Sequence, residues 1–352
     1  MTRSGRENPA VLRPLLLDWF TRSQRSLPWR HTHDPYAIWV SEVMLQQTRV
    51  AVVLDRYREF LERFPTVQSL ARATEAEVLT VWSGLGYYRR ARMLHRGAQQ
   101  VCAEHGGQLP GTFAALLALP GIGPYTASAI ASIAFGEPVA AVDGNVERVV
   151  LRLVGADAGQ GTVLRRVQAC ADQLLDPDSP GNWNQAMMEL GATVCLPRAP
   201  HCEACPWIAA CATRGEHLTV KRPPMRSVAV AYHWTVRGAG DRQNLLLVQR
   251  DQEQTVMAGM WELPEAADHA HDPAQPLLRL RHAIMQMNYE VAIYPGEATL
   301  RLPSKRTFRW VTQKQAQALP LTGLARKVMQ RLGWLPARKS LVAAPKIKAQ
   351  KM

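Results

Sequence analysis

Two acidic residues stand where a carboxylate could take part in acid–base chemistry. Glu42 shares an apolar helical face with Ile38 and Leu45, at positions i, i+4 and i+7. An ionised carboxylate is costly there, so Glu42 is either half of a buried salt bridge with an arginine or an acid whose pKa is raised by burial. Asp143 follows the apolar run Val139–Val142 and precedes a predicted helix, whose N-terminus it is expected to cap as an anion.

A cysteine cluster is the second feature that could do chemistry. Four of the six cysteines have the spacing C-x6-C-x2-C-x5-C, and these are Cys195, Cys202, Cys205 and Cys211. Thiolates on one short loop can surround a single metal ion or a cubane iron–sulfur cluster. Zinc sites usually have two short C-x2–4-C knuckles, and this stretch has only one. Cys102 and Cys170 stand alone and are expected to be small buried apolar residues.

A glycine-rich turn at Leu119–Tyr125 separates two predicted helices, Phe113–Ala118 and Thr126–Ala134. Gly121 and Gly123 permit a tight turn whose backbone amides point outward at a helix N-terminus. Such amides, together with the helix dipole, favour a phosphate group.

The elements that must position these residues are helical from Pro9 to about Ala212. Val11, Leu15, Leu16 and Trp19 are expected on one face of a first helix. The apolar pattern then predicts one long helix over residues 35–61, with Pro65 just beyond its end. The first part of the chain is therefore predicted to be all-α.

The pattern changes after Cys211. Residues 213–227 are polar and basic and are predicted to form a linker. Strands are expected at Val228–Val236 and Asn244–Gln249, joined by the turn-rich Arg237–Gln243. The remaining predicted elements are strands near Tyr289–Tyr294 and Thr307–Val311 and a helix near Leu321–Leu332. This part is predicted to be an α+β module.

Composition limits the class of partner. The 352 residues carry a formal net charge of +13 with a pI near 9.8, which favours a polyanion such as nucleic acid over simple solubility. No apolar run approaches the length of a membrane span, and no apolar signal segment begins the chain, so a cytoplasmic protein without membrane contact is expected. The basic stretch Arg338–Met352 is given no role in a site.

Three of these motifs together resemble the MutY family of adenine DNA glycosylases, in the endonuclease III-like helix–hairpin–helix superfamily. They are the string S-E-V-M-L-Q-Q-T at residues 41–48, the hairpin L-P-G-I-G-P-Y at 119–125 and the cysteine spacing. The resemblance implies a monomeric bacterial base excision repair enzyme, found in the cytoplasm and nucleoid, that binds double-stranded DNA. It would hydrolyse the N-glycosidic bond of adenine mispaired with 8-oxoguanine or guanine, and the four cysteines would hold one [4Fe–4S] cluster.

The resemblance also implies a domain plan. Residues 1–212 would form the all-α catalytic domain, with a six-helix module at about 25–138 and a cluster-bearing module from 1–24 and 139–212. Residues 213–227 would be the linker, 228–335 a MutT/Nudix-like α+β recognition domain and 336–352 a basic disordered tail.

Roles for individual side chains follow from the same resemblance. Glu42 would be the general acid and later the base, because adenine leaves as a poor anion unless it is protonated. Asp143 would stabilise the oxocarbenium ion or act as a transient nucleophile. Tyr125 occupies the position of the lysine found in bifunctional relatives. Since tyrosine cannot form a Schiff base, little or no strand cleavage is expected.

Binding roles are implied for a further set of residues. Those expected to line the adenine pocket are Trp29, Arg30, Leu45, Gln185 and Glu189. Gln47 and Tyr87 would fill the space left by a flipped base, beside Gln46, and at least one of Trp82 and Tyr88 is expected to be core. Gly121 and Gly123 would contact the DNA backbone.

The C-terminal module departs from the family pattern. Where the family has a Phe-Ser-His loop for 8-oxoguanine, this chain has Ile284-Met285-Gln286. Met285 and Gln286 are the candidate contacts to the opposite base, and reduced selectivity for oxidised guanine is expected. The segment lacks the dense glutamates of a Nudix hydrolase, so pyrophosphatase activity is not expected.

Three other functions stay open at this point. One is a thymine–guanine mismatch glycosylase, which also has a tyrosine at the hairpin position. Another is a catalytically silent iron–sulfur DNA-binding protein, which would need neither Glu42 nor Asp143. The third is an endonuclease III-like lyase, which Tyr125 disfavours.

Overall fold

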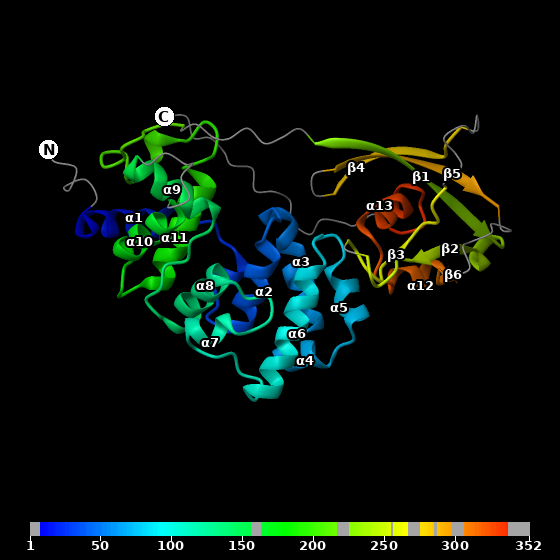
Figure 1. The fold of residues 1–352 in the computed structure, drawn as a ribbon, viewed down its shortest axis with the longest axis horizontal. Coiled ribbons are helices and arrows are strands. Elements are labelled where there is room, and N and C mark those ends of the chain that lie inside the picture. The colour runs from blue at the N-terminus through cyan, green and yellow to red at the C-terminus, as the bar shows by residue number, and fades with distance from the viewer. Residues whose placement is uncertain are drawn as a thin grey trace. The chain divides into compact units, whose positions relative to one another are not determined.

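The computed structural model describes residues 8–155, 163–216, 225–254, 256–266, 275–284, 287–297 and 306–336. The chain divides into two compact units (Figure 1). The first comprises Met1–Tyr57, Phe64–Ala71 and Arg96–Lys221, and the second comprises Arg58–Arg63, Arg72–His95 and Arg222–Met352.

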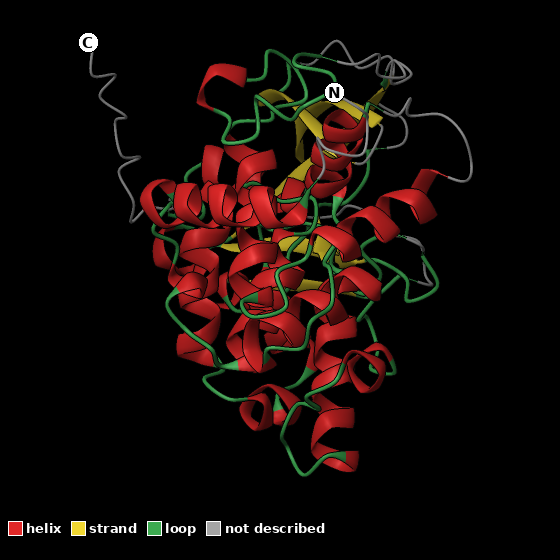
Figure 2. Ribbon diagram, turned by 90° about the vertical axis from the view of Figure 1, so that its left-hand side faces the viewer, coloured by secondary structure: helices red, strands yellow, loops and turns green. Residues whose placement is uncertain are grey.

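Helices make up all the regular structure described in the first unit (Figure 2). Two of them, α3 and α6, run on into the second unit. The helices are α1 (Pro9–Ser23), α2 (Pro35–Leu45), α3 (Val50–Arg63), α4 (Val67–Arg72), α6 (Arg89–Glu104), α7 (Phe113–Leu117), α8 (Pro124–Phe135), α9 (Gly144–Val154), α10 (Val163–Leu174) and α11 (Pro180–Thr193), with short 3-10 turns η2 (Pro28–Arg30) and η3 (Cys202–Ala204).

One core of this unit joins α1, α9, α10 and α11. From α1 it takes Leu12, Leu16 and Phe20, which are almost fully buried, whereas Val11 and Leu15 are 55% and 45% exposed. Of the four residues expected on one face, Leu16 and Trp19 belong to this core and Val11 and Leu15 do not, so the predicted face was only partly correct. Both faces are apolar, so packing against the other helices decides which of them is buried.

The predicted long helix over residues 35–61 is also wrong, because the structure has two helices there. Helix α2 ends at Leu45, and α3 begins at Val50. Between them Gln47 has φ 55, a left-handed conformation that cannot continue a right-handed helix. The break places the end of α2, with Gln46 and Gln47, at the edge of a cavity.

Helix α8 is the buried helix on which the site is built. Its residues from Thr126 to Ile133 are all buried, and most of them are alanine or serine, so other helices can approach closely. It contacts α2, α7 and α11. The predicted helices on either side of the hairpin, now α7 and α8, are confirmed.

The second unit contains a six-stranded sheet, and the predicted strands belong to it (Figure 1). Five strands have the order β3-β2-β1-β5-β4, β1 and β5 are parallel, and β6 pairs with β2. The strands are β1 (Arg226–Arg237), β2 (Asn244–Gln249), β3 (Trp261–Glu262), β4 (Leu278–Ile284), β5 (Met287–Gly296) and β6 (Phe308–Val311). The prediction of a helical part followed by a part with a sheet is confirmed.

Helices complete this unit. Those it contains are the last part of α3, α5 (Glu75–Trp82), the first part of α6, η4 (Gly240–Arg242), α12 (Gln313–Gln317) and α13 (Gly323–Arg331). Val328 and Met329 of α13 are fully buried and pack in one core with Leu245 and Leu247 of β2. In the described part of the chain, no helix is both long enough and apolar enough to cross a bilayer.

Candidate active site

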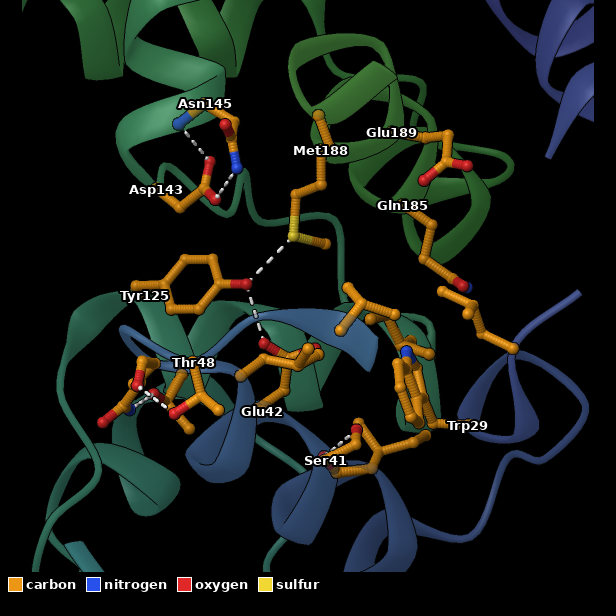
Figure 3. Close-up of a pocket in the computed structure, with 18 of the residues that line it drawn as sticks. Trp29, Ser41, Glu42, Thr48, Tyr125, Asp143, Asn145, Gln185, Met188 and Glu189 are labelled. Carbon is orange, nitrogen blue, oxygen red and sulfur yellow. Dashed lines mark hydrogen bonds between the residues drawn. The ribbon is translucent and has the colours of Figure 1, made fainter. Parts of the chain in front are cut away.

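A cavity of about 690 Å³ lies in the first unit, and residues from five segments of the sequence line it (Figure 3). Helix α2 contributes Glu42, the hairpin contributes Tyr125, the start of α9 contributes Asp143, and α11 contributes Glu189. The structure therefore brings together three carboxylates that lie between 46 and 147 residues apart in the chain.

Glu42 is buried in the wall of this cavity and is only 5% exposed. Its Oε2 accepts a hydrogen bond from the Tyr125 hydroxyl at 2.7 Å. Among the described residues it forms no ion pair, so the salt-bridge interpretation of Glu42 is wrong. Burial is the main cause that raises the pKa of Glu42, to about 7, and the negative charge of Asp143 adds to it, while Tyr125 and Arg30 oppose it.

Asp143 differs from Glu42 in its surroundings, because it lies at a helix N-terminus among several hydrogen-bond donors. It is the N-cap of α9, as predicted, and its Oδ1 accepts hydrogen bonds from the backbone amides of Asn145 and Val146 at 2.9 and 2.8 Å. Its Oδ2 accepts a third from the Asn145 side chain at 2.9 Å. These three donors fix the orientation of the Asp143 side chain at the start of α9.

Tyr125 lies between the two carboxylates in the cavity (Figure 3). Its hydroxyl also lies 2.9 Å from the sulfur of Met188. Burial, followed by the charges of Glu42 and Asp143, raises the pKa of Tyr125 well above its usual value. The phenol therefore keeps its proton and remains a donor at neutral pH.

The hairpin presents backbone to solvent at the start of α8. Gly121 and Gly123 are exposed while Ile122 between them is buried. Gly121 has φ 78, so the turn requires glycine at this position, whereas Gly123 is extended and caps α8 without a side-chain bond. The exposed amides at this N-terminus are the feature that the sequence suggested for a phosphate.

Glu189 does not offer a free carboxylate to the cavity. It is fully buried, and its oxygens accept from Arg25 Nη2 at 2.6 Å, Arg25 Nε at 2.8 Å and Arg30 Nη2 at 2.7 Å. Burial alone would raise its pKa, but the two guanidinium groups outweigh it and hold the pKa of Glu189 at about 2. The guanidinium of Arg30 also lies 5.2 Å from the Phe20 ring centroid.

The other predicted pocket residues divide into two groups. Trp29, Leu45, Gln47 and Gln185 line the cavity together with Arg30. Tyr87 does not line it and belongs to the second unit, where it is 44% exposed with φ 46. Trp82 and Tyr88 are both buried, so the expectation that at least one is core is confirmed.

Sequence reasoning missed several residues of the site. Arg25 and Met188 line the cavity, and Asn145 bonds to Asp143. Arg148 donates to the Asn145 side chain at 2.7 Å and to the carbonyl oxygen of Cys195 at 2.8 Å. Asn145 could have been predicted, because it lies two residues after the predicted N-cap Asp143. Nothing in the neighbouring sequence indicated Arg25, Met188 or Arg148.

Helix α11 comes close to Asp143 because of a glycine. A Cβ on Gly191 would lie 2.6 Å from the Asn145 Cβ and 3.0 Å from its carbonyl oxygen. Such distances require the two helices to separate, so Gly191 allows α11 to hold the capped start of α9 against the cavity.

The four cysteines surround a second, small cavity in the first unit. Arg152 lies beside them, with its Nη1 3.3 Å from the Cys195 sulfur and also donating to the carbonyl oxygen of Leu196 at 2.7 Å. In the described part of the chain, no three potential ligands converge closely enough to hold a single metal ion. Four thiols therefore lie around one space, with a cation beside them.

The opposite-base residues can be located only in part. Ile284 is half-buried at the end of β4. Met285 and Gln286, as well as the basic stretch 338–352, lie outside the described residues.

Comparisons with known proteins define the class first. Residues 40–190 match the model of the HhH-GPD superfamily of base excision DNA repair proteins. A thermostable thymine-DNA glycosylase has a similar structure, with a TM-score of 0.55 and 28% identity over 60% of this chain and 99% of that one.

Sequence relatives then define the family. The adenine DNA glycosylase of Rattus norvegicus is 34% identical over 90% of this chain and 76% of the rat protein. The adenine DNA glycosylase of Homo sapiens is 48% identical over 58% of this chain, and the matched segment spans 39% of the human protein. The chain belongs to the MutY family of adenine DNA glycosylases.

Proposed function

We propose that this chain removes adenine from mispaired DNA by hydrolysing its N-glycosidic bond, without cleaving the strand. The observation that carries the proposal is the buried carboxyl of Glu42, which lines one cavity with the capped carboxylate of Asp143. The family membership and the names of the rat and human relatives support the same activity.

Glu42 acts as the general acid. With a pKa of about 7, about half of its carboxyl groups are protonated at neutral pH. It therefore has a proton to donate to a ring nitrogen of adenine as the glycosidic bond stretches, and as an anion it can then accept a proton from the attacking water. An exposed glutamate would be almost fully ionised at this pH and would make a poor acid.

Asp143 stabilises the positive charge that develops on the sugar. Three hydrogen-bond donors hold its carboxylate in place, where it faces the oxocarbenium ion or attacks it as a transient nucleophile. Tyr125 donates a hydrogen bond to Glu42 and keeps its own proton. Since it has no amine, no Schiff base forms and strand cleavage does not follow.

DNA binding uses residues around and beyond the cavity. Trp29, Arg30, Leu45 and Gln185 enclose the flipped adenine, and the Glu189 carboxylate at the cavity wall holds Arg30 in place. Three groups act on the duplex itself. Gln47 and Tyr87 enter the base stack, and the exposed amides at Gly121 and Gly123 bind a backbone phosphate.

The cysteine cavity holds one [4Fe–4S] cluster, with Cys195, Cys202, Cys205 and Cys211 as ligands. The fit rests on four thiols that line one small cavity, and on Arg152 beside Cys195 to balance the negative charge. When bound, the cluster would cross-link the loop and thereby hold the carbonyl of Cys195 against Arg148.

The C-terminal part binds the opposite strand. We keep the expected plan of a catalytic domain at 1–212, a linker at 213–227, a MutT/Nudix-like domain at 228–335 and a basic tail at 336–352. Because Ile284-Met285-Gln286 replaces Phe-Ser-His, we expect weak preference for 8-oxoguanine over guanine opposite adenine. The protein is proposed to act as a monomer.

One alternative substrate has a specific observation in its favour. A structurally similar protein is a thymine-DNA glycosylase, so thymine opposite guanine is the second candidate. The presence of a C-terminal unit with a sheet and the adenine-specific relatives favour adenine.

Single-turnover assays on three duplexes test the proposal, with adenine opposite 8-oxoguanine, adenine opposite guanine, and thymine opposite guanine. Strand breaks should appear at the adenine duplexes only after alkali treatment. Glu42→Gln should lower the rate by about a thousandfold, the scale of a lost general acid. The exposed Glu62→Gln on α3 is the matched control and should leave it unchanged.

The outcomes separate the parts of the proposal. Cleavage without alkali would overturn the monofunctional assignment, and product only from the thymine duplex would replace the substrate. An excision rate opposite 8-oxoguanine at least a hundredfold above that opposite guanine would refute the weak selectivity.

A further inference from the structure

The loop Ser83–Tyr88, here called the wedge loop, joins α5 to α6 and presents Tyr87 to solvent within the second unit. Tyr87 has φ 46, and the two glycines before it, Gly84 and Gly86, are also left-handed. An exposed tyrosine in a strained backbone conformation persists only if its surroundings hold it there.

Interactions within the loop provide part of that support. The guanidinium of Arg90 lies 5.3 Å from the Tyr87 ring centroid and 5.5 Å from that of the buried Trp82. Arg90 also donates to the carbonyl oxygens of Leu85 and Gly86 at 3.2 and 3.3 Å, and Trp82 Nε1 donates to Gly86 at 3.1 Å. The loop is therefore braced against α5 and α6.

Both ends of the loop bond to the C-terminal segment of the chain. Ser83 is fully buried at the point where α5 ends. Its hydroxyl accepts a hydrogen bond of 2.7 Å from Nε of Arg326 on α13. At the other end, the hydroxyl of the buried Tyr88 donates to the carbonyl oxygen of Leu321 at 3.4 Å. Tyr87 thus lies between two attachments to a segment more than 230 residues away.

We infer that Arg326 is a positioning residue for the wedge loop, so that the C-terminal helix α13 helps to hold Tyr87 in the conformation that enters DNA. Arg326 itself touches no reacting atom. Its bond fixes the residue at which the loop begins, and a charged donor to a buried hydroxyl is stronger than a neutral one. The inference rests on the proposed function in assuming that Tyr87 enters the base stack.

The inference predicts that base flipping responds to Arg326 while the chemical step does not. In the full-length protein, Arg326→Met removes the bond to Ser83, and Arg331→Met is the control, since it removes an exposed arginine at the end of the same helix. The probe is a duplex with 2-aminopurine in place of the target adenine, whose fluorescence rises as it leaves the stack.

Arg326→Met should lower the flipped fraction at saturating protein and the excision rate by about tenfold, the factor for one lost charged hydrogen bond. The pH profile of excision should keep its midpoint. Arg326→Lys, which still carries a donor, should recover part of the signal. Ser83→Ala should reproduce the loss, and the double variant should lose no more than either single one.

Equal fluorescence for Arg326→Met and Arg331→Met would overturn the inference, as would additive losses in the double variant. If Arg326→Met does not fold, the smaller change Ser83→Ala decides alone by the same fluorescence. A wild-type protein that flips 2-aminopurine but removes no adenine would count against the proposed function only. An active wild type with an unaffected Arg326→Met would count against this inference only.

Discussion

Glu42 on α2 and Glu189 on α11 line the same cavity and are both buried, yet they have opposite proton affinities. The pKa of Glu42 is raised to about 7, and that of Glu189 is lowered to about 2. Burial is the largest single cause for both residues and raises the pKa of each. The difference therefore comes from the partners, because Glu42 has one phenol and Glu189 has two guanidinium groups.

This difference teaches how one pocket can hold a proton donor and a permanent anion side by side. A carboxyl that gives up its proton must not be paired with a cation, whereas a carboxylate that fixes a pocket wall must be. The Arg25 and Arg30 pairs hold the segment around Trp29 against α11. The site therefore depends on those cations being paired with Glu189 and not with Glu42.

The largest expected effect on this comparison comes from Glu189→Gln. It leaves Arg25 and the buried Arg30 without their anion and should lower the free energy of unfolding by about 3 kcal/mol at pH 7, measured by urea denaturation. The loss should shrink as pH falls from about 5 toward 2, because the low pKa of Glu189 stabilises the fold only while the carboxylate is ionised.

The control for this change is Asp18→Asn, which breaks the exposed Arg22–Asp18 pair on α1. It should change stability by less than about 0.5 kcal/mol. If Glu189→Gln were as mild as this control, the two arginine pairs would not hold the pocket wall. The comparison between the two glutamates would then rest on Glu42 alone.

A smaller effect of opposite sign is expected for the stability of Glu42→Gln. The folded pKa of Glu42 lies above its unfolded value near 4.5, so the fold loses stability as pH rises from about 4.5 to about 7, where the buried carboxyl itself ionises and the loss is complete. The glutamine variant cannot ionise. It should match the wild type near pH 4 and exceed it by about 2 to 3 kcal/mol at pH 9.

The measurement is urea unfolding at several pH values, with the exposed Glu62→Gln as the control. If Glu42→Gln is inactive and yet has a higher free energy of unfolding than the wild type at alkaline pH, the buried carboxyl of Glu42 is needed for catalysis and destabilises the fold. Equal stability at pH 9 would instead mean that the pKa of Glu42 is close to its ordinary value.

Much of the scaffold was predictable because it depends on local pattern. The helices on both sides of the hairpin, the cap at Asp143 and the strand at Asn244–Gln249 each follow from residues next to them in sequence. The burial of Glu42 was also predictable, since it lies on an apolar stripe of α2. These inferences needed no knowledge of distant contacts.

What failed or was missed depends on long-range packing. The pattern through residues 45–50 continues the helix locally, but the chain breaks at Gln47. The partners of Glu189 lie more than 150 residues away, so the sequence alone showed only a polar side chain. Likewise nothing near Ser83 points to Arg326.

The smallest expected effect comes from Tyr125→Phe and separates the phenol from the rest of the pocket. The Tyr125 hydroxyl donates to ionised Glu42 and so lowers its pKa, which means that its removal raises that pKa further. Because catalysis needs the protonated acid, activity falls as pH rises through the pKa of Glu42. This alkaline fall should therefore move to higher pH in the variant, with a rate loss at neutral pH of about tenfold or less.

Single-turnover rates between pH 5 and 9 measure the shift. Tyr36→Phe is the control, because Tyr36 lies on α2 with Glu42 but does not line the cavity. It removes a buried hydroxyl that donates to the carbonyl oxygen of Phe64, and its pH profile should stay in place. A move to lower pH in Tyr125→Phe would mean that the phenol stabilises the protonated form of Glu42, and the contrast with the arginine-paired Glu189 would need another cause.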